Sequence, residues 1–125
     1  SAFSSVSFGD KTEASGVASS AMGRNSIASG SAAIAMGDGA SARGSGSTSL
    51  GVQTRAEGDA AFAVGGGSAA LGALSVAAGA FVAAQGASSV ALGAGTTAVG
   101  EASTSVGSLT RSVGYASPGR SSRDR

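Results

Sequence analysis

The sequence predicts an all-β fold, a parallel β-roll wound from eight coils of 14 residues. Of its 22 glycines, 16 recur at a spacing of seven residues, from Gly9 to Gly114. The residue two positions before each of these glycines is always Ala or Ser. The residue immediately before Gly belongs alternately to an entirely apolar series and to a mixed series, so the true repeat is two heptads long.

A heptad spacing is also typical of coiled coils, but this sequence excludes one. A coiled coil needs large apolar residues at two positions of each heptad and good helix formers between them. Here every heptad contains a glycine, which costs a helix about 1 kcal/mol relative to alanine. The segments between the glycines, such as Val90–Ala91–Leu92, instead have the period of two that is typical of short strands.

The small residues predict a narrow interior. Side chains alternate across a strand, so Ala91 faces away from Val90 and Leu92. The residue three positions after each periodic glycine is also small or short, and Val82 is the largest of that series. We therefore expect two closely spaced sheets with Ala and Ser between them, and glycines that supply the backbone freedom for each tight reversal.

The outward positions of the first strand of each coil form a continuous apolar stripe. A stripe of this length is not expected to remain in water on a monomer, so the sequence predicts an oligomer. We define the apolar stripe as the residues expected between subunits, which are Val6, Phe8, Met22, Ile34, Met36, Leu50, Phe62, Val64, Val76, Val90, Leu92 and Val106.

The outward positions of the second strand are irregular and more polar, which predicts a face in contact with solvent. This face is the candidate ligand face. Its candidate residues are Arg43, Arg55, Glu57, Leu71 and Gln85.

Composition excludes several kinds of chemistry. The chain has no Cys and no His, which removes zinc sites of the Cys/His type, thiol catalysis and histidine acid–base catalysis. The net charge is only +1, and Lys and Arg form no basic stripe that could bind nucleic acid. The sequence has no run of 18 apolar residues, the length that a membrane-spanning helix needs. We therefore expect no catalytic residue, no metal, no cofactor and no membrane-spanning segment in this part of the protein.

Three local clusters of residues could be functional sites or could have a structural role only. Gly65–Gly67 and Gly37–Asp38–Gly39 resemble phosphate or calcium turns, but neither precedes a helical pattern and both are expected to be structural. Glu57 and Asp59 flank Gly58, and solvated turn residues are a better interpretation than a catalytic pair.

Between Leu71 and Val82, large residues occupy positions that are small or polar elsewhere; they are Leu71, Leu74, Phe81 and Val82. They form either an exposed adhesive patch or, as we favour, a contact with a neighbouring subunit.

The repeats resemble the YadA-like head repeats of trimeric autotransporter adhesins, whose consensus is close to Asn-Ser-Val-Ala-Ile-Gly. The matching segments are Ser4–Gly9, Ala32–Gly37 and Ser88–Gly93. The resemblance implies a left-handed roll, a homotrimer, display at the bacterial outer membrane and attachment to host cells or extracellular matrix. Collagen, fibronectin and laminin are the ligands that it suggests.

The period stops after Gly114. Residues 1–110 are therefore expected to form the head repeats, and residues 111–125 the start of a neck or a disordered tail. The segment Arg111–Gly119 resembles the start of the neck of this family, whereas Arg120, Arg123 and Arg125 depart from its pattern. Because Ser1 lies inside a repeat, we expect the chain to be part of a longer protein whose signal peptide and anchor lie elsewhere.

Two functions of different classes fit these observations. The first is an adhesin that binds host ligands through many weak contacts, and the second is a structural spacer that only projects another module. A third, an ice-binding solenoid, needs a regular face of Thr or similar residues, which the irregular outward positions lack.

Overall fold

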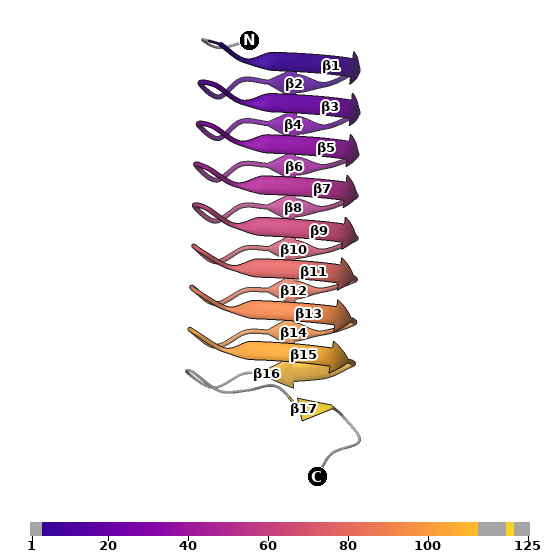
Figure 1. The fold of residues 1–125 in the computed structure, drawn as a ribbon, viewed down its shortest axis with the longest axis vertical. Helices are drawn as coiled ribbons and strands as arrows, with labels where there is room; N and C mark the ends of the chain where they lie inside the picture. The colour runs from indigo at the N-terminus through magenta and orange to yellow at the C-terminus, as the bar shows by residue number, and fades with distance from the viewer. Residues whose placement is uncertain (1–3, 113–119, 122–125) are drawn as a thin grey trace.

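The chain is a flat parallel β-solenoid of eight coils, as the computed structural model shows for residues 4–112 and 120–121 (Figure 1). Each coil has a five-residue strand on one wall and a shorter strand on the opposite wall. No helix occurs among the described residues. The all-β class, the parallel pairing and the 14-residue coil are thereby confirmed.

Two sheets make up the walls. The long-strand sheet contains β1 (Val6–Asp10), β3 (Ser20–Arg24), β5 (Ile34–Asp38), β7 (Thr48–Val52), β9 (Phe62–Gly66), β11 (Val76–Ala80), β13 (Val90–Ala94) and β15 (Thr104–Ser108). The short-strand sheet contains β2 (Glu13–Ala14), β4 (Ile27–Ala28), β6 (Ser41–Ala42), β8 (Arg55–Ala56), β10 (Ala69–Ala70), β12 (Ala83–Ala84), β14 (Thr97–Ala98), β16 (Thr110–Ser112) and β17 (Arg120–Ser121).

Successive coils pair in register, each residue beside the one 14 positions later. Val76 on β11 is paired with Val90 on β13, and Ala77 with Ala91. The parallel short-strand sheet continues through Ser112 on β16, two residues beyond the boundary expected at residue 110. After it, β17 pairs with β16 in the antiparallel sense. Most of the expected neck, residues 113–119 and 122–125, lies outside the described residues.

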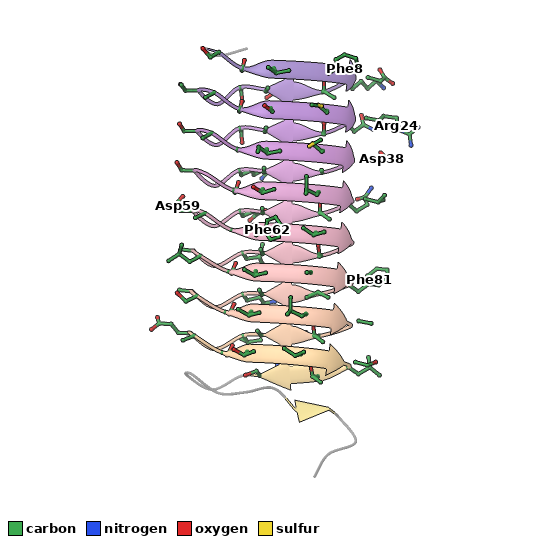
Figure 2. The ribbon with its side chains drawn as sticks, in the orientation of Figure 1. Phe8, Arg24, Asp38, Asp59, Phe62 and Phe81 are labelled. Carbon is green, nitrogen blue, oxygen red and sulfur yellow. The ribbon has the colours of Figure 1, made fainter. Side chains whose placement is uncertain are left out.

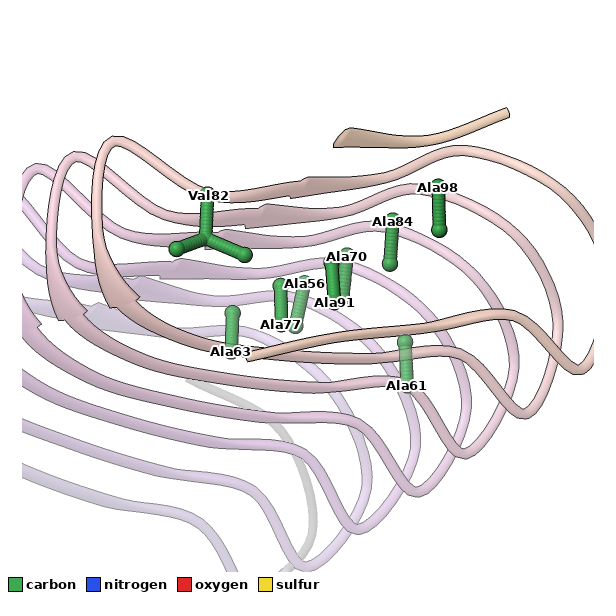
Figure 3. Packing of buried hydrophobic residues seen from close by; sticks show 9 residues of the cluster. All are labelled: Ala56, Ala61, Ala63, Ala70, Ala77, Val82, Ala84, Ala91 and Ala98. Atoms are coloured by element: carbon green, nitrogen blue, oxygen red, sulfur yellow. The ribbon is translucent and has the colours of Figure 1, made fainter. Parts of the chain in front are cut away.

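The interior between the walls is filled by four small side chains per coil. Ala63 and Ala91 are fully buried, as the sequence predicted, and the buried alanines of the two walls point toward each other (Figure 3). Several buried hydroxyls are paired locally: Ser19 Oγ donates to the Gly16 carbonyl oxygen at 2.7 Å, and the Ser49 and Thr54 hydroxyl oxygens lie 2.6 Å apart. Small residues are therefore required because the two walls are close.

Val82 belongs to this interior. It is 1 % exposed and is the largest fully buried side chain in the described part of the chain. Its position, three residues after Gly79, is buried in every coil from Ser26 to Thr110, and Ser68 and Thr96 occupy it in the adjacent coils. The expectation that Val82 lies in an exposed patch or a subunit contact is therefore wrong.

The periodic glycines do not occupy the positive-φ position of the turns, contrary to the sequence expectation, although those within the long strands also have positive φ. The residue with positive φ in each turn is the second one after the periodic glycine, such as Ala60, Leu74 or Phe81. Gly72 has no positive φ, and a Cβ at that position would lie 2.2 Å from the Gly86 carbonyl oxygen. Glycine is required there because adjacent coils approach closely. The long strands also continue one residue past their glycine rather than ending at it.

Candidate functional site

The outer face of the long-strand sheet carries the whole apolar stripe. Each member is the first or the third residue of its long strand, and equivalent residues of successive coils stack in two columns. The stripe extends from β1 to β15, and neither column lacks a large apolar side chain in two successive coils. Phe8 is 73 % exposed and Phe62 is 39 % exposed, and both project from this sheet (Figure 2). Nothing within the described part of the chain covers this face, and at the two stripe positions of the described strands only Ser20, Thr48 and Thr104 are polar.

The outer face of the short-strand sheet carries the five candidate ligand residues. Arg43, Glu57, Leu71 and Gln85 lie in successive coils of one column, each directly after its short strand. The backbone N–H groups continue the sheet there; the N–H of Glu57, for example, donates to the Ala70 carbonyl oxygen at 2.9 Å. Adjacent residues of the column are therefore about 4.8 Å apart along the roll.

One ion pair on this face changes the charge that it presents. The Arg55 guanidinium contacts the Glu57 carboxylate two residues later in the same coil, with Arg55 Nε donating to Glu57 Oε2 at 2.9 Å. Arg43 and Gln85 remain exposed on the same face. The face thus presents isolated polar groups and a neutralised pair rather than a field of one sign.

Turns form the two narrow edges of the roll. We call the turns that follow each long strand the exit edge and the turns that precede each long strand the entry edge. Phe81 lies on the exit edge and Asp59 on the opposite, entry edge (Figure 2). The sequence analysis did not distinguish these edges from the two faces. Four glycines outside the seven-residue series do mark the positive-φ position of the turns on the two edges; they are Gly39, Gly46, Gly67 and Gly95.

Charges at the N-terminal end of the exit edge are paired between coils. Arg24 Nη2 lies 2.6 Å from Asp38 Oδ2, joining the last residues of β3 and β5 (Figure 2). The hydrogen bond from Arg24 lowers the pKa of the Asp38 carboxyl group below its usual value. The same hydrogen bond, helped by the charge of Asp38, raises the pKa of Arg24.

The large residues expected to form one patch are distributed over the whole coil. Leu71 lies half-buried on the short-strand face, Leu74 on the entry edge, Phe81 on the exit edge and Val82 in the interior. A single adhesive patch made from these four residues is therefore excluded. Their positions differ because the strand between Leu74 and Phe81 crosses the full width of the roll.

The carboxylates considered as a catalytic pair have separate structural partners. Glu57 contacts Arg55, whereas Asp59 Oδ1 accepts a hydrogen bond from the Ser45 backbone N–H at 3.2 Å across one coil. Within residues 4–112, no three His, Cys, Asp or Glu side chains gather as metal ligands would. The part of the chain that the structure describes also has no helix long and apolar enough to cross a membrane.

A family model identifies the repeats. The model of the YadA head domain repeat, which spans two copies, matches residues 1–26, 14–40, 42–68 and 84–110. These segments cover most of the chain, which therefore belongs to the YadA head repeat family. This is a family of head domains of surface-exposed trimeric autotransporter adhesins and not a family of enzymes. A comparison with curated proteins found no match.

Proposed function

We propose that this chain is the head of a homotrimeric adhesin on the bacterial outer membrane and that it attaches to host cells or extracellular matrix. Three left-handed rolls stand side by side with their apolar stripes toward a common axis. Their short-strand faces then point outward, where Arg43, Arg55, Glu57, Leu71 and Gln85 meet the ligand. The family membership supports the adhesin class, and the two faces of the roll support this orientation.

The exposed stripe is the observation that carries the proposal. In the single chain Val6, Phe8 and Val106 are each about half exposed or more, although the chain has an interior that buries alanines and Val82. That interior is filled by Ala, Ser and Thr, with Val82 as its largest side chain, and has no space for the stripe. Full burial of an exposed large apolar side chain contributes about 1.5–3 kcal/mol, so the exposed members of the stripe favour association most, and the half-buried members add less.

Binding on the outward face is expected to be polyvalent. The side chains of the short-strand face recur every coil, and a trimer presents three copies of each column. A long ligand such as a collagen fibre contacts several weak sites at once, which raises avidity by about 10² to 10⁴ through effective concentration. Fibronectin and laminin are extended ligands of the same kind.

The test has two measurements. Light scattering of the purified head should give the mass of three chains. The purified trimer should also bind to a surface coated with collagen, fibronectin or laminin. A monomer would contradict the proposal. A trimer that binds none of these ligands, and no host cell, would support the alternative in which the roll is a structural spacer for another module.

A further inference from the structure

Leu74 and Phe81 are large apolar residues on the two narrow edges, and they flank the same strand, β11. Leu74 is 63 % exposed on the entry edge, and Phe81 is 78 % exposed on the exit edge. Both have positive φ, 60° and 56°, a conformation that bulky side chains rarely adopt. Neither residue gains burial within its own chain from this arrangement.

Leu74 is exceptional in size among its equivalents, whereas the exit-edge equivalents of Phe81 include the large side chains of Lys11, Gln53 and Leu109. The other positive-φ residues of the entry edge are no larger than Ala or Ser: Ser4, Ala18, Ala32, Gly46, Ala60, Ser88 and Ala102. Phe81 is the one aromatic residue at the positive-φ position of the described exit edge. Its ring lies over Gly67 of the preceding coil, with Cδ1 3.0 Å from where a Cβ on Gly67 would stand. The ring is therefore held on the surface of the edge.

The same coil has a reduced apolar stripe. Ala78 stands on β11 at the outward position where the other long strands carry Phe8, Met22, Met36, Leu50, Val64, Leu92 and Val106. In this coil the long-strand face has the small Ala78 at that outward position, while the large apolar side chains of Leu74 and Phe81 lie on the two edges. A smaller side chain beside the axis lets the rolls approach more closely at this height, which also brings neighbouring edges together.

Within one chain Leu74 and Phe81 cannot meet, because the seven residues from one to the other span about 20 Å of extended backbone. A rotation about an axis parallel to the roll moves each residue around the axis and leaves its height unchanged. The entry edge of one roll therefore faces the exit edge of the next, which is the head-to-tail contact that closes a ring. In such a ring Leu74 and Phe81 of different copies lie at the same height, to within about half of the 4.8 Å coil spacing.

We propose that Phe81 of each copy packs against Leu74 of the neighbouring copy, forming an apolar edge-to-edge contact that fixes the axial register of the assembly. This inference rests on the proposed homotrimer. It assigns a partner, a second copy of this chain, to two exposed residues that the apolar stripe does not include. The contact also accounts for the bulky side chain of Leu74 at an entry-edge position that the other coils fill with Gly, Ala or Ser.

Cysteine cross-linking tests the contact, because the chain contains no cysteine of its own. The Leu74→Cys and Phe81→Cys double variant should give covalent dimers and trimers on oxidation or with a short thiol cross-linker. Each single variant should remain uncrosslinked, whereas a mixture of the two single variants, refolded together, should give dimers. The matched control pairs Leu74→Cys with Leu109→Cys, an exposed exit-edge residue two coils further along, and should give no covalent product.

Light scattering on the same samples separates the possible failures. A trimer without a Leu74–Phe81 cross-link overturns the edge contact and leaves the proposed function intact, as does equal cross-linking with Leu109→Cys. A monomer overturns both. A second variant, Leu74→Ser with Phe81→Gly, uses residues that other coils carry at these positions, so it should fold as before. The variant should also dissociate at a concentration at least tenfold higher than the unmodified head; an unchanged dissociation concentration would contradict the contact.

Discussion

Gly65 and Gly79 lie in adjacent coils so closely that a Cβ on Gly65 would stand 1.9 Å from the Gly79 carbonyl oxygen. The φ of Gly65 is also +118°, in a region that residues with a side chain rarely adopt. This relationship recurs at other periodic glycines of the long-strand sheet, including Gly9, Gly37 and Gly93. It explains why the spacing of seven is maintained.

Gly65→Ala should therefore destabilise the roll by at least about 2 kcal/mol, since it combines an unfavourable φ with a clash against backbone. The adjacent Gly66 is the matched control, because a Cβ there would meet nothing within 4 Å. Gly66→Ala should change the free energy of unfolding by less than about 1 kcal/mol. Thermal or urea unfolding of the two variants checks the difference, and equal melting behaviour would contradict the close-approach explanation.

Replacing an interior alanine should overfill the space between the sheets. Ala91→Leu, and separately Ala63→Leu, should lower the free energy of unfolding by about 1–3 kcal/mol, because both residues are fully buried. Ala87→Leu is a suitable control, since Ala87 is exposed on the entry edge. A melting curve that Ala91→Leu leaves unchanged would refute the narrow interior.

The ion pair between coils should be visible in the titration of one carboxyl group. Arg24→Gln removes the hydrogen bond that lowers the pKa of Asp38, so this pKa should rise toward the ordinary value of an aspartate. In the unmodified protein the stabilisation from Asp38 is present above its unfolded-state pKa and is lost as the pH falls through its lower folded-state pKa. Because the Arg24 and Asp38 side chains are 64 % and 39 % exposed, the effect on stability should be small.

Titration of the Asp38 side chain by NMR checks this expectation. Arg55→Gln is the control, because Arg55 contacts Glu57 on the short-strand face and not Asp38. An Asp38 pKa that does not respond to Arg24→Gln would show that the pair between coils does not persist in solution.

Ligand binding should decline by degrees when the outward polar residues are replaced. Single alanine variants of Arg43, Arg55, Glu57 and Gln85 should each weaken attachment to collagen-coated surfaces slightly, and the quadruple variant should weaken it most. Surface plasmon resonance on intact trimers measures this series. Complete loss from one substitution would reveal a discrete site and contradict distributed binding.

The sequence predicted the parts of the fold that repeat. The 14-residue period gave the coil, and the small residues around Ala91 identified the interior, because each was repeated many times in the same phase. Val82 occupies the second small position of the repeat, three residues after Gly79, so its burial was also encoded. Its size alone had suggested a surface role.

The exceptions to the repeat were harder to predict. That Leu74 and Phe81 lie on opposite edges depends on where the turns fall, and the glycines appeared to mark the turns. They mark instead the places where adjacent backbones approach, while the turn residue with positive φ follows two positions later. Asp38 and Arg24 lie 14 residues apart with no motif around either to suggest an ion pair, yet they meet because residues 14 apart are neighbours in adjacent coils.

The central claim is that the apolar stripe lies between subunits, and the oligomeric mass of one double variant tests it most directly. Ile34→Asp with Leu92→Asp places two charges in the stripe, where burial without partners is costly. Light scattering should report a monomer for this variant. The matched control, Ile27→Asp with Thr97→Asp on the outer short-strand face, should remain a trimer. A trimer from Ile34→Asp with Leu92→Asp would contradict the account.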